Sequence, residues 1–439
     1  MSKTLCPLPW IHMGVQQNGD LRQCCLMHSN NKEAPYGKVI VDGKAAHFDA
    51  PLMDSARNAE GLKQIRRDMM EGKQPPACNL CWKEEALGIF TKRQTMLRIY
   101  NMARLLSHTE ADGTIDTDNL PLHYLDLRLG NLCNLKCRSC GATDSSLWIA
   151  DHAKLYPRKD GTAPLLFYGS KVYNILPDGN DYRIDSNDFE WYNNPDFHTW
   201  MDERIMHGLN RIYFTGGEPS INKHHMAVLD RIIELEKASD FVLEYNSNMI
   251  AIPPRLLKQW SQFKEVHIGA SIDAMGPLAH YVRHPTNWNF IERTLDQIGY
   301  GQIPSIIAGF STTISILNIR QFVEMSRWLI TKFYTSIRKY PSWHLLHEPP
   351  YYSIQCLPFD MKVIVEGEFE EFFQWVEKNF GKAEAIGVRN NYAGIIRFMK
   401  QKSTTHRLKE LKEITLKLDK IRNEKMADHL PWLAEILEI

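Results

Sequence analysis

The sequence has no excess of charge of either sign, because its 52 Lys and Arg residues balance its 52 Asp and Glu residues. Proteins that bind bulk nucleic acid usually carry a basic excess, so we expect no such partner. No apolar run approaches the roughly 18 residues needed to span a bilayer, and we expect no membrane partner. Repeats and low-complexity tracts are also absent. The 439 residues therefore predict a globular protein of about two to four domains.

The first residues, MSKTLCPLPW, lack the basic and apolar segments of a secretory signal, so we expect a cytoplasmic protein. Cysteine is the informative residue type: there are 9 cysteines, and all but Cys356 lie before residue 141 in tight clusters. In a reducing compartment such clusters bind metal or carry out redox chemistry more often than they form disulfides.

Strand and helix patterns alternate from residue 123 onward, which predicts an α/β fold with a parallel sheet, open or curled into a barrel. The expected strands are Tyr124–Leu129, Arg211–Phe214, Phe241–Tyr245, Val266–Ser271 and Ile303–Thr312, with a sixth in Tyr351–Leu357. Helical spacing occupies the intervening segments near 223–237, 254–262, 288–300 and 318–333.

We divide the chain into three parts. Residues 1–100 are expected to form a small cysteine-bearing module, with a hairpin turn at Asn18-Gly19-Asp20 and a short helix within Asn58–Gly72. Residues 120–360 are expected to form the α/β core, interrupted at about 157–200 by an insertion or substrate loop. Its aromatic segment Phe189–Trp200 is either local core or a substrate contact. Residues 361–439 are predicted to be helical, with Phe369–Phe380 and Leu408–Ile421 at helical spacing.

The strongest local pattern is C-x3-C-x2-C, formed by Cys133, Cys137 and Cys140 directly after the first core strand. The flanking Gly130 and Gly141 predict a loop rather than one face of a buried helix. Thiolates suit iron–sulfur clusters and zinc, but structural zinc usually takes four protein ligands. Three thiolates instead suit a cubane cluster in which one iron has no protein ligand.

Further candidate residues follow the next strands, where the carboxyl ends of parallel strands gather binding residues. Thr215-Gly216-Gly217-Glu218-Pro219 follows the second strand, with glycines that permit close approach and a carboxylate for a cation. Asn248 follows the third strand, and Ser271 and Asp273 follow the fourth, with Arg283 shortly after. These side chains can bind hydroxyl and carboxylate groups, although turn capping and a surface arginine are equally ordinary uses.

A second set of cysteines comes from three segments before residue 82: Cys6, Cys24 or Cys25, Cys78 and Cys81. Four such thiols can complete a closed tetrahedral or cubane site. Cys356 stands alone, and we expect it to be buried, although a strand-end position also allows a catalytic role.

Together, the CNLKCRSC loop and the following Gly-Gly-Glu-Pro motif resemble the radical S-adenosylmethionine (SAM) superfamily over residues 123 to about 357. The resemblance implies a partial (β/α)6 TIM-like barrel and a [4Fe–4S] cluster on Cys133, Cys137 and Cys140. It also implies that SAM binds the open iron of this cluster. Gly216, Gly217 and Glu218 would bind the SAM ammonium, and the later strand-end residues would contact its ribose and carboxylate.

The N-terminal cysteines resemble the auxiliary-cluster module called SPASM or its shortened form, twitch, placed before the core instead of after it. This implies an auxiliary [4Fe–4S] cluster on Cys6, Cys24, Cys78 and Cys81, with Cys24 preferred by its spacing from Gly19 and Cys25 left as the spare. A structural zinc site is the main alternative.

The resemblance implies reductive cleavage of SAM to a 5′-deoxyadenosyl radical, which abstracts hydrogen from a substrate; we expect that substrate to be a peptide or protein. It also implies an electron donor such as flavodoxin or ferredoxin. No residue is identified as a catalytic acid or base. Two other classes stay open: an iron–sulfur electron carrier, which would not need Gly216-Gly217-Glu218, and a zinc-stabilised scaffold protein.

Overall fold

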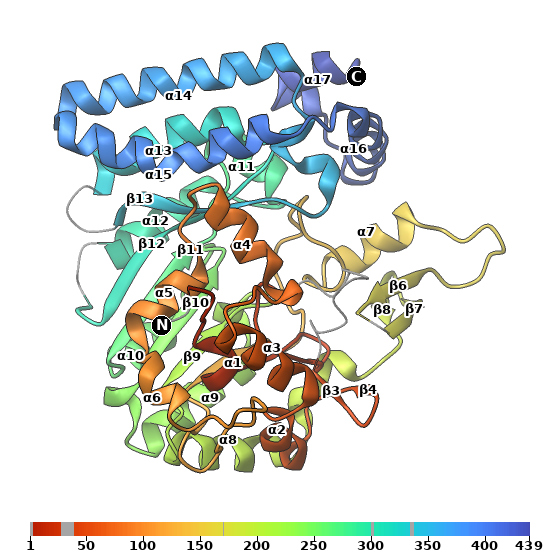
Figure 1. The fold of residues 1–439 in the computed structure, drawn as a ribbon. Coiled ribbons are helices and arrows are strands. Elements are labelled where there is room, and N and C mark those ends of the chain that lie inside the picture. The colour runs from red at the N-terminus through yellow and green to blue at the C-terminus, as the bar shows by residue number, and fades with distance from the viewer. Residues whose placement is uncertain (1–2, 28–38, 170, 300–302, 334–337) are drawn as a thin grey trace.

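An eight-stranded sheet forms the centre of the computed structural model, which describes residues 3–27, 39–169, 171–299, 303–333 and 338–439 (Figure 1). Its strand order is β13-β12-β11-β10-β9-β5-β1-β2, and all neighbours are parallel except β1 and β2. The strands are β1 (His12–Val15), β2 (Leu21–Arg22), β5 (Tyr124–Leu127), β9 (Arg211–Phe214), β10 (Val242–Ser247), β11 (Glu265–Ala270), β12 (Ile306–Ile314) and β13 (Arg338–Leu345).

The predicted α/β alternation is confirmed, and five of the expected strands correspond to β5, β9, β10, β11 and β12. The sixth is wrong. Residues of Tyr351–Leu357 form the short 3₁₀ helices η6 (Pro350–Tyr352) and η7 (Ile354–Cys356), and the edge strand is β13 instead. Local capping explains the error: Pro350 begins η6, and the Ser353 side chain accepts a hydrogen bond from the Gln355 amide at the start of η7. Curling of the sheet into a partial barrel stays a prediction.

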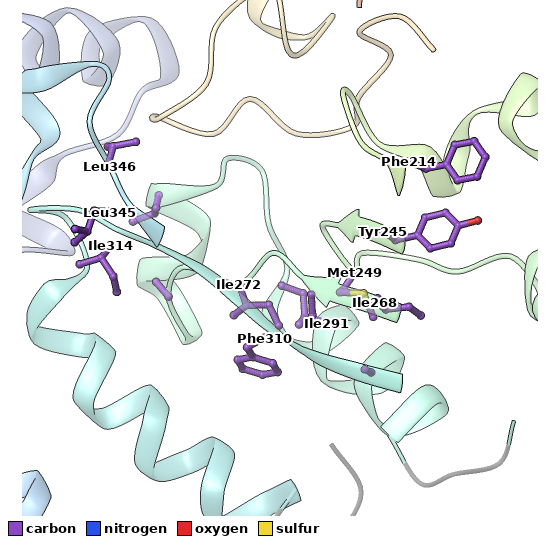
Figure 2. Close-up of a cluster of buried hydrophobic side chains, with 14 of the residues drawn as sticks. Phe214, Tyr245, Met249, Ile268, Ile272, Ile291, Phe310, Ile314, Leu345 and Leu346 are labelled. Carbon is purple, nitrogen blue, oxygen red and sulfur yellow. The ribbon is translucent and has the colours of Figure 1, made fainter. Parts of the chain in front are cut away.

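The two faces of the sheet differ in chemistry because side chains alternate along each strand. One face is apolar and packs under the helices; its central row is Val15, Leu127, Phe214, Tyr245 and Ile268. Figure 2 shows Phe214, Tyr245 and Ile268 of this row within the buried cluster that also holds Phe310. The opposite face carries the row Gly14, Asp126, Tyr213, Glu244 and His267. Such polar side chains on a central parallel sheet indicate a face that serves a site.

Helices follow the strands where their spacing predicts them: α9 (Lys223–Glu234), α10 (Pro254–Trp260), α12 (Trp288–Gly299) and α13 (Ile319–Phe333). A further helix, α11 (Gly276–Val282), was not predicted. Pro219 opens a short 3₁₀ helix, η4 (Pro219–Ile221), just before α9. Buried Val228, Leu229 and Ile232 of α9 join the same core as the apolar face of the sheet. The strand ends are thereby left for loops that carry polar residues.

The N-terminal segment is joined to the core through β1, which pairs in parallel with β5. The predicted hairpin is confirmed, since β1 and β2 are antiparallel and Gly19 takes φ +81° in the turn. The predicted helix is α3 (Glu60–Met70). The other elements are α1 (Leu8–Ile11), β3 (Ile40–Val41), β4 (Lys44–Ala45), α2 (Ala50–Ala56), η2 (Pro76–Cys78), α4 (Asn79–Ala86), α5 (Lys92–Ile99) and α6 (Met102–Leu106). Residues 1–2 and 28–38 of the predicted module lie outside the described residues.

The segment expected as an insertion or substrate loop is largely regular structure. After α7 (Trp148–Leu155) come three antiparallel strands, β6 (Leu165–Tyr168), β7 (Lys171–Asp178) and β8 (Asp181–Ile184), then η3 (Asp188–Asn193) and α8 (Asp196–Met206). Phe189, Trp191, Phe197 and Trp200 are buried, so this aromatic segment is local core.

The C-terminal part is helical, as predicted. It comprises α14 (Phe359–Phe380), α15 (Lys382–Gln401), α16 (Leu408–Arg422) and α17 (Pro431–Leu437), with η8 (Thr405–Arg407) and η9 (Met426–Asp428) between them. Figure 1 shows α14 and α15 as the long blue pair. Within the described ranges, no helix combines the length and apolar composition that a membrane crossing requires.

Candidate functional site

The loop that carries Cys133, Cys137 and Cys140 follows β5 and is held by hydrogen bonds at several points. The Trp148 indole donates to the Cys137 carbonyl at 2.7 Å, and the Ser145 hydroxyl donates to the Leu135 carbonyl at 2.5 Å. Cys137 is buried, whereas Cys133 and Cys140 are partly exposed. The loop is therefore a preformed support for thiols, open on one side.

The three thiols differ in their electrostatic surroundings. Burial raises the pKa of Cys133 to about 12. A hydrogen bond from the Cys140 thiol lowers the pKa of Cys137 to about 7 and raises that of Cys140 itself. Since a metal ligand is the thiolate, metal binding must release the protons of Cys133 and Cys140.

The Gly-Gly-Glu segment lies directly against this loop. The Glu218 amide donates to the Leu132 carbonyl at 2.8 Å, and a Cβ added at Gly217 would overlap that same carbonyl. Gly217 also takes φ +61°, which glycine adopts without strain. Glycine is thus required here for close approach between two loops, as well as for any approach of a ligand.

The Glu218 carboxylate ties its loop to the end of β10. It is 2% exposed and accepts hydrogen bonds from the Ser220 amide at 3.0 Å, the Ser247 hydroxyl at 2.9 Å and the Asn248 amide at 2.7 Å. A carboxylate has about four acceptor positions, so about one is left for a ligand. Positioning of neighbouring loops is therefore the main role that this geometry gives to Glu218.

Asn248 and Ser271 extend the contacts along the strand ends. The Asn248 side-chain amide donates to the Asn134 side-chain oxygen, inside the cysteine loop, at 2.6 Å. The Ser271 backbone donates to the Ser247 carbonyl at 2.7 Å. The structure therefore brings the cysteine loop, the Gly-Gly-Glu segment and the ends of β10 and β11 together at one edge.

Asp273 and Arg283 form a buried ion pair beside the thiols. Arg283 Nη1 lies 2.8 Å from Asp273 Oδ2, and the Thr313 amide donates to Asp273 Oδ1 at 2.8 Å. Although burial opposes its charge, Cys137 and Asp273 raise the pKa of Arg283 overall. Arg283 Nε is buried and has no hydrogen-bond partner within the described part of the chain. This N–H is available to an anionic ligand next to the cysteines.

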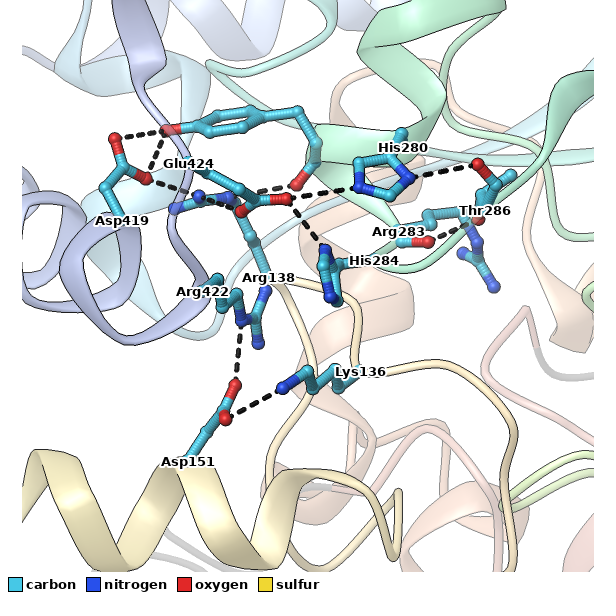
Figure 3. A network of polar contacts seen from close by, with 11 residues as sticks. Lys136, Arg138, Asp151, His280, Arg283, His284, Thr286, Asp419, Arg422 and Glu424 are labelled. Atoms are coloured by element: carbon cyan, nitrogen blue, oxygen red, sulfur yellow. Dashed lines mark hydrogen bonds and ion pairs between the residues drawn. The ribbon is translucent and has the colours of Figure 1, made fainter.

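A network that the sequence did not reveal fastens the loop to the C-terminal helices (Figure 3). The Lys136 and Arg138 amides donate to the His284 and Val282 carbonyls at 2.6 and 2.8 Å. The Arg138 guanidinium also contacts Asp419 of α16 at 2.5 Å and Glu424 at 2.8 Å. No local signal could have identified these partners, which lie more than 280 positions apart from Arg138.

The second cysteine set gathers around one cavity. Cys6, Cys24, Cys78 and Cys81 all line it, together with Lys92 and Arg93, whereas Cys25 does not. Burial raises the pKa of Cys6 to about 12 and that of Cys81 to about 11. The structure thus brings together the four cysteines that the spacing favoured.

Among the described residues, the group of three or more potential ligands found within 4.8 Å of one another is His280, His284 and Glu424. The thiols of Cys137 and Cys140 are hydrogen-bonded to each other. The chemistry of both cysteine sets suits an iron–sulfur cluster or zinc.

Lys92 lies over the polar face of the sheet, close to the second cysteine set. The Lys92 ammonium lies 3.1 Å from Glu244 of β10, and the Tyr124 hydroxyl donates to the same carboxylate at 2.8 Å.

The side chain of Gln23 is buried, and neither its amide nitrogen nor its oxygen has a partner within the described ranges. Cys356 is buried as the last residue of η7, and its sulfur lies 3.2 Å from Thr404 Oγ1.

No family model matches the sequence, and no curated protein matches it. Solved structures give partial likenesses. A histidine-tagged anSMEcpe with bound AdoMet is 14% identical, with a TM-score of 0.38 over 59% of this chain and 60% of that one. Streptococcus suis SuiB bound to precursor peptide SuiA is 12% identical, with a TM-score of 0.36 over 84% and 70%. SuiB bound to S-adenosylmethionine is 12% identical, with a TM-score of 0.35 over 87% and 71%. The chain thus covers less than two thirds of anSMEcpe.

Proposed function

We propose that this protein is a radical SAM enzyme that modifies a peptide or protein substrate. The observation that carries the proposal is the direct packing of a three-cysteine loop against the Gly216-Gly217-Glu218 segment, through the Glu218 amide and the Leu132 carbonyl. An electron carrier needs the thiols but does not need a second loop held at this distance from them.

Cys133, Cys137 and Cys140 would hold a [4Fe–4S] cluster, to which SAM would bind. When bound, this cluster supplies the single electron that cleaves SAM to methionine and a 5′-deoxyadenosyl radical. Arg283 Nε, buried and without a protein partner in the described residues, would bind the SAM carboxylate.

The backbone of Gly216 and Gly217 would bind the SAM ammonium, with Glu218 as a positioning residue that has about one acceptor left. Asn248, Ser271 and Asp273 would complete the pocket at the strand ends. Asp273 acts mainly by holding Arg283, which it contacts at 2.8 Å.

Cys6, Cys24, Cys78 and Cys81 would hold an auxiliary [4Fe–4S] cluster in the cavity that they line. The chemistry of four thiols around one cavity, three buried and one partly buried, fits this group. Gln23 lies beside these cysteines in the chain, and both polar ends of its buried side chain lack partners in the described ranges. A peptide backbone supplies an N–H and a C=O that would satisfy both ends, which supports a peptidyl substrate.

The decisive assay is anaerobic. The reconstituted protein is reduced, by dithionite or by flavodoxin or ferredoxin with their reductase, and 5′-deoxyadenosine is measured after SAM is added. We expect production by the wild type, none by a Cys133/Cys137/Cys140→Ala variant, and full production by the control Cys356→Ala, whose thiol is buried elsewhere. Iron-loaded protein that binds no SAM and makes no 5′-deoxyadenosine would favour an electron carrier, and zinc in place of iron would favour a scaffold protein.

A further inference from the structure

Three potential metal ligands meet outside both cysteine sets, where the end of α11 contacts the segment after α16. They are His280 Nε2, His284 Nδ1 and a carboxylate oxygen of Glu424, all within 4.8 Å of one another. Figure 3 shows the two imidazole rings turned toward this carboxylate. All three residues are partly buried, so a bound ion would be sheltered but reachable.

The protonation of His280 makes this arrangement unusual. Its Nδ1 lies 3.2 Å from the Thr286 carbonyl, which only accepts, so Nδ1 carries the proton. In the neutral ring, Nε2 then has no proton and presents its lone pair to Glu424 Oε1, which lies 3.6 Å away. That distance is too long for a hydrogen bond. Two acceptors that face each other in this way are stabilised by a cation between them.

The surroundings match those of a metal ligand set. The Thr286 carbonyl fixes the His280 tautomer, as backbone carbonyls commonly do for metal-binding histidines. Arg138 donates to Glu424 Oε2 at 2.8 Å, which orients the carboxylate and leaves Oε1 toward the histidines. The Asp419 carboxylate lies 2.5 Å from the Arg138 guanidinium and neutralises its positive charge. The negative charge of Glu424 therefore stays available to a cation.

We propose that His280, His284 and Glu424 form a binding site for a divalent first-row metal ion, with Zn²⁺ favoured by two imidazole nitrogens and one carboxylate oxygen. Zinc bonds of about 2.0–2.2 Å place tetrahedral ligands roughly 3.3 Å apart. The His284–Glu424 distance of 2.7 Å would therefore open slightly and the His280–Glu424 distance of 3.6 Å would close. Water takes the fourth position, because the His280 side chain is 43% exposed.

The ion would act as a clamp on the cysteine loop. The Lys136 and Arg138 amides donate to the carbonyls of His284 and Val282, so the ligand-bearing segment is also the support of that loop. Glu424 belongs to the C-terminal part of the chain. Metal binding thus joins that part to the loop, whether or not the cysteines hold a cluster.

The test uses the anaerobically reconstituted, iron-loaded protein, dialysed against micromolar Zn²⁺ and washed. We expect one zinc per chain in addition to the iron, with a zinc K-edge spectrum that shows nitrogen and oxygen at about 2.0–2.1 Å and no sulfur at about 2.3 Å. Absence of bound zinc, or sulfur in its coordination shell, overturns the proposal without any variant.

Variants supply a second measurement. His280→Gln, at a partly exposed position, should lose the zinc and keep the iron. The matched control is His267→Gln, which removes a histidine that pairs with Glu265 at 2.7 Å and, among the described residues, belongs to no three-ligand group. It should keep both metals. Equal zinc in His280→Gln and the wild type overturns the assignment.

Discussion

Replacement of Gly217 by alanine tests whether the cysteine loop and the Gly-Gly-Glu segment function as one unit. The added Cβ would overlap the Leu132 carbonyl oxygen and lie 2.9 Å from its carbon, whereas ordinary contacts begin at 3.4 Å. The carbonyl must therefore shift by about half an ångström or more, which disturbs the hydrogen bond of 2.8 Å that it accepts from the Glu218 amide.

Two contributions set the magnitude. The φ of +61° costs an alanine about 1–2 kcal/mol. Loss of the buried hydrogen bond from Glu218 adds about 1–3 kcal/mol. Gly179 offers a matched control, because it has the same φ of +61° and, in the described part of the chain, no atom within 4 Å of an added Cβ. We expect Gly179→Ala to lower the free energy of unfolding by about 1–2 kcal/mol and Gly217→Ala by about 2–5 kcal/mol.

Urea unfolding measures both variants, and iron per chain and 5′-deoxyadenosine production are followed alongside. If the contact matters, Gly217→Ala loses SAM cleavage while Gly179→Ala retains it. The reasoning is refuted if the two variants are equally stable and equally active, because the overlap with Leu132 would then have no consequence.

Three further outcomes are expected. Burial raises the pKa of Glu244, but Lys92 and its other partners lower it overall to about 2, so its stabilisation is present above pH ~4.5 and lost as the pH falls toward 2. Glu244→Gln should cost roughly 3–5 kcal/mol at pH 7 and flatten this acid dependence in urea unfolding; an unchanged pH profile would contradict it. Arg138→Met removes the guanidinium that Asp419 and Glu424 share and should cost roughly 3–5 kcal/mol, with faster hydrogen exchange in residues 131–146; exchange at the wild-type rate would oppose it. Cys24→Ser should lower iron per chain, whereas Cys25→Ser should not, and the reverse result would exchange their roles.

Periodicity and turn chemistry were sufficient for most of the core. Arg211–Phe214 was predicted as a strand and is β9 in full, because a short apolar run that ends at two glycines has few alternatives. The Asn18-Gly19 hairpin was equally readable, since Gly19 adopts the positive φ that such a turn requires.

The wrong strand has a local cause, and the omissions came from long-range contacts. Tyr351–Leu357 has strand composition, yet Pro350 begins η6 and Ser353 caps η7. The pairing of β1 with β5 joins strands more than 100 positions apart, and Arg138 meets Asp419 across 281 positions. Nothing in the local spacing of these residues predicts such partners, because tertiary packing alone selects them.

The parallel pairing of β1 with β5 explains how the N-terminal segment comes to lie beside the Cys133 loop. β5 precedes the Cys133 loop, and β1 lies beside it, so residues just after β1 emerge at the same edge. Gln17 donates to Asp144 at 2.8 Å and lies against Gly216, which places the N-terminal segment in contact with both loops. A module that followed β13 would start from the far edge of the sheet. Chain order and strand order therefore combine to place the N-terminal segment beside the first core strand, next to the Cys133 loop.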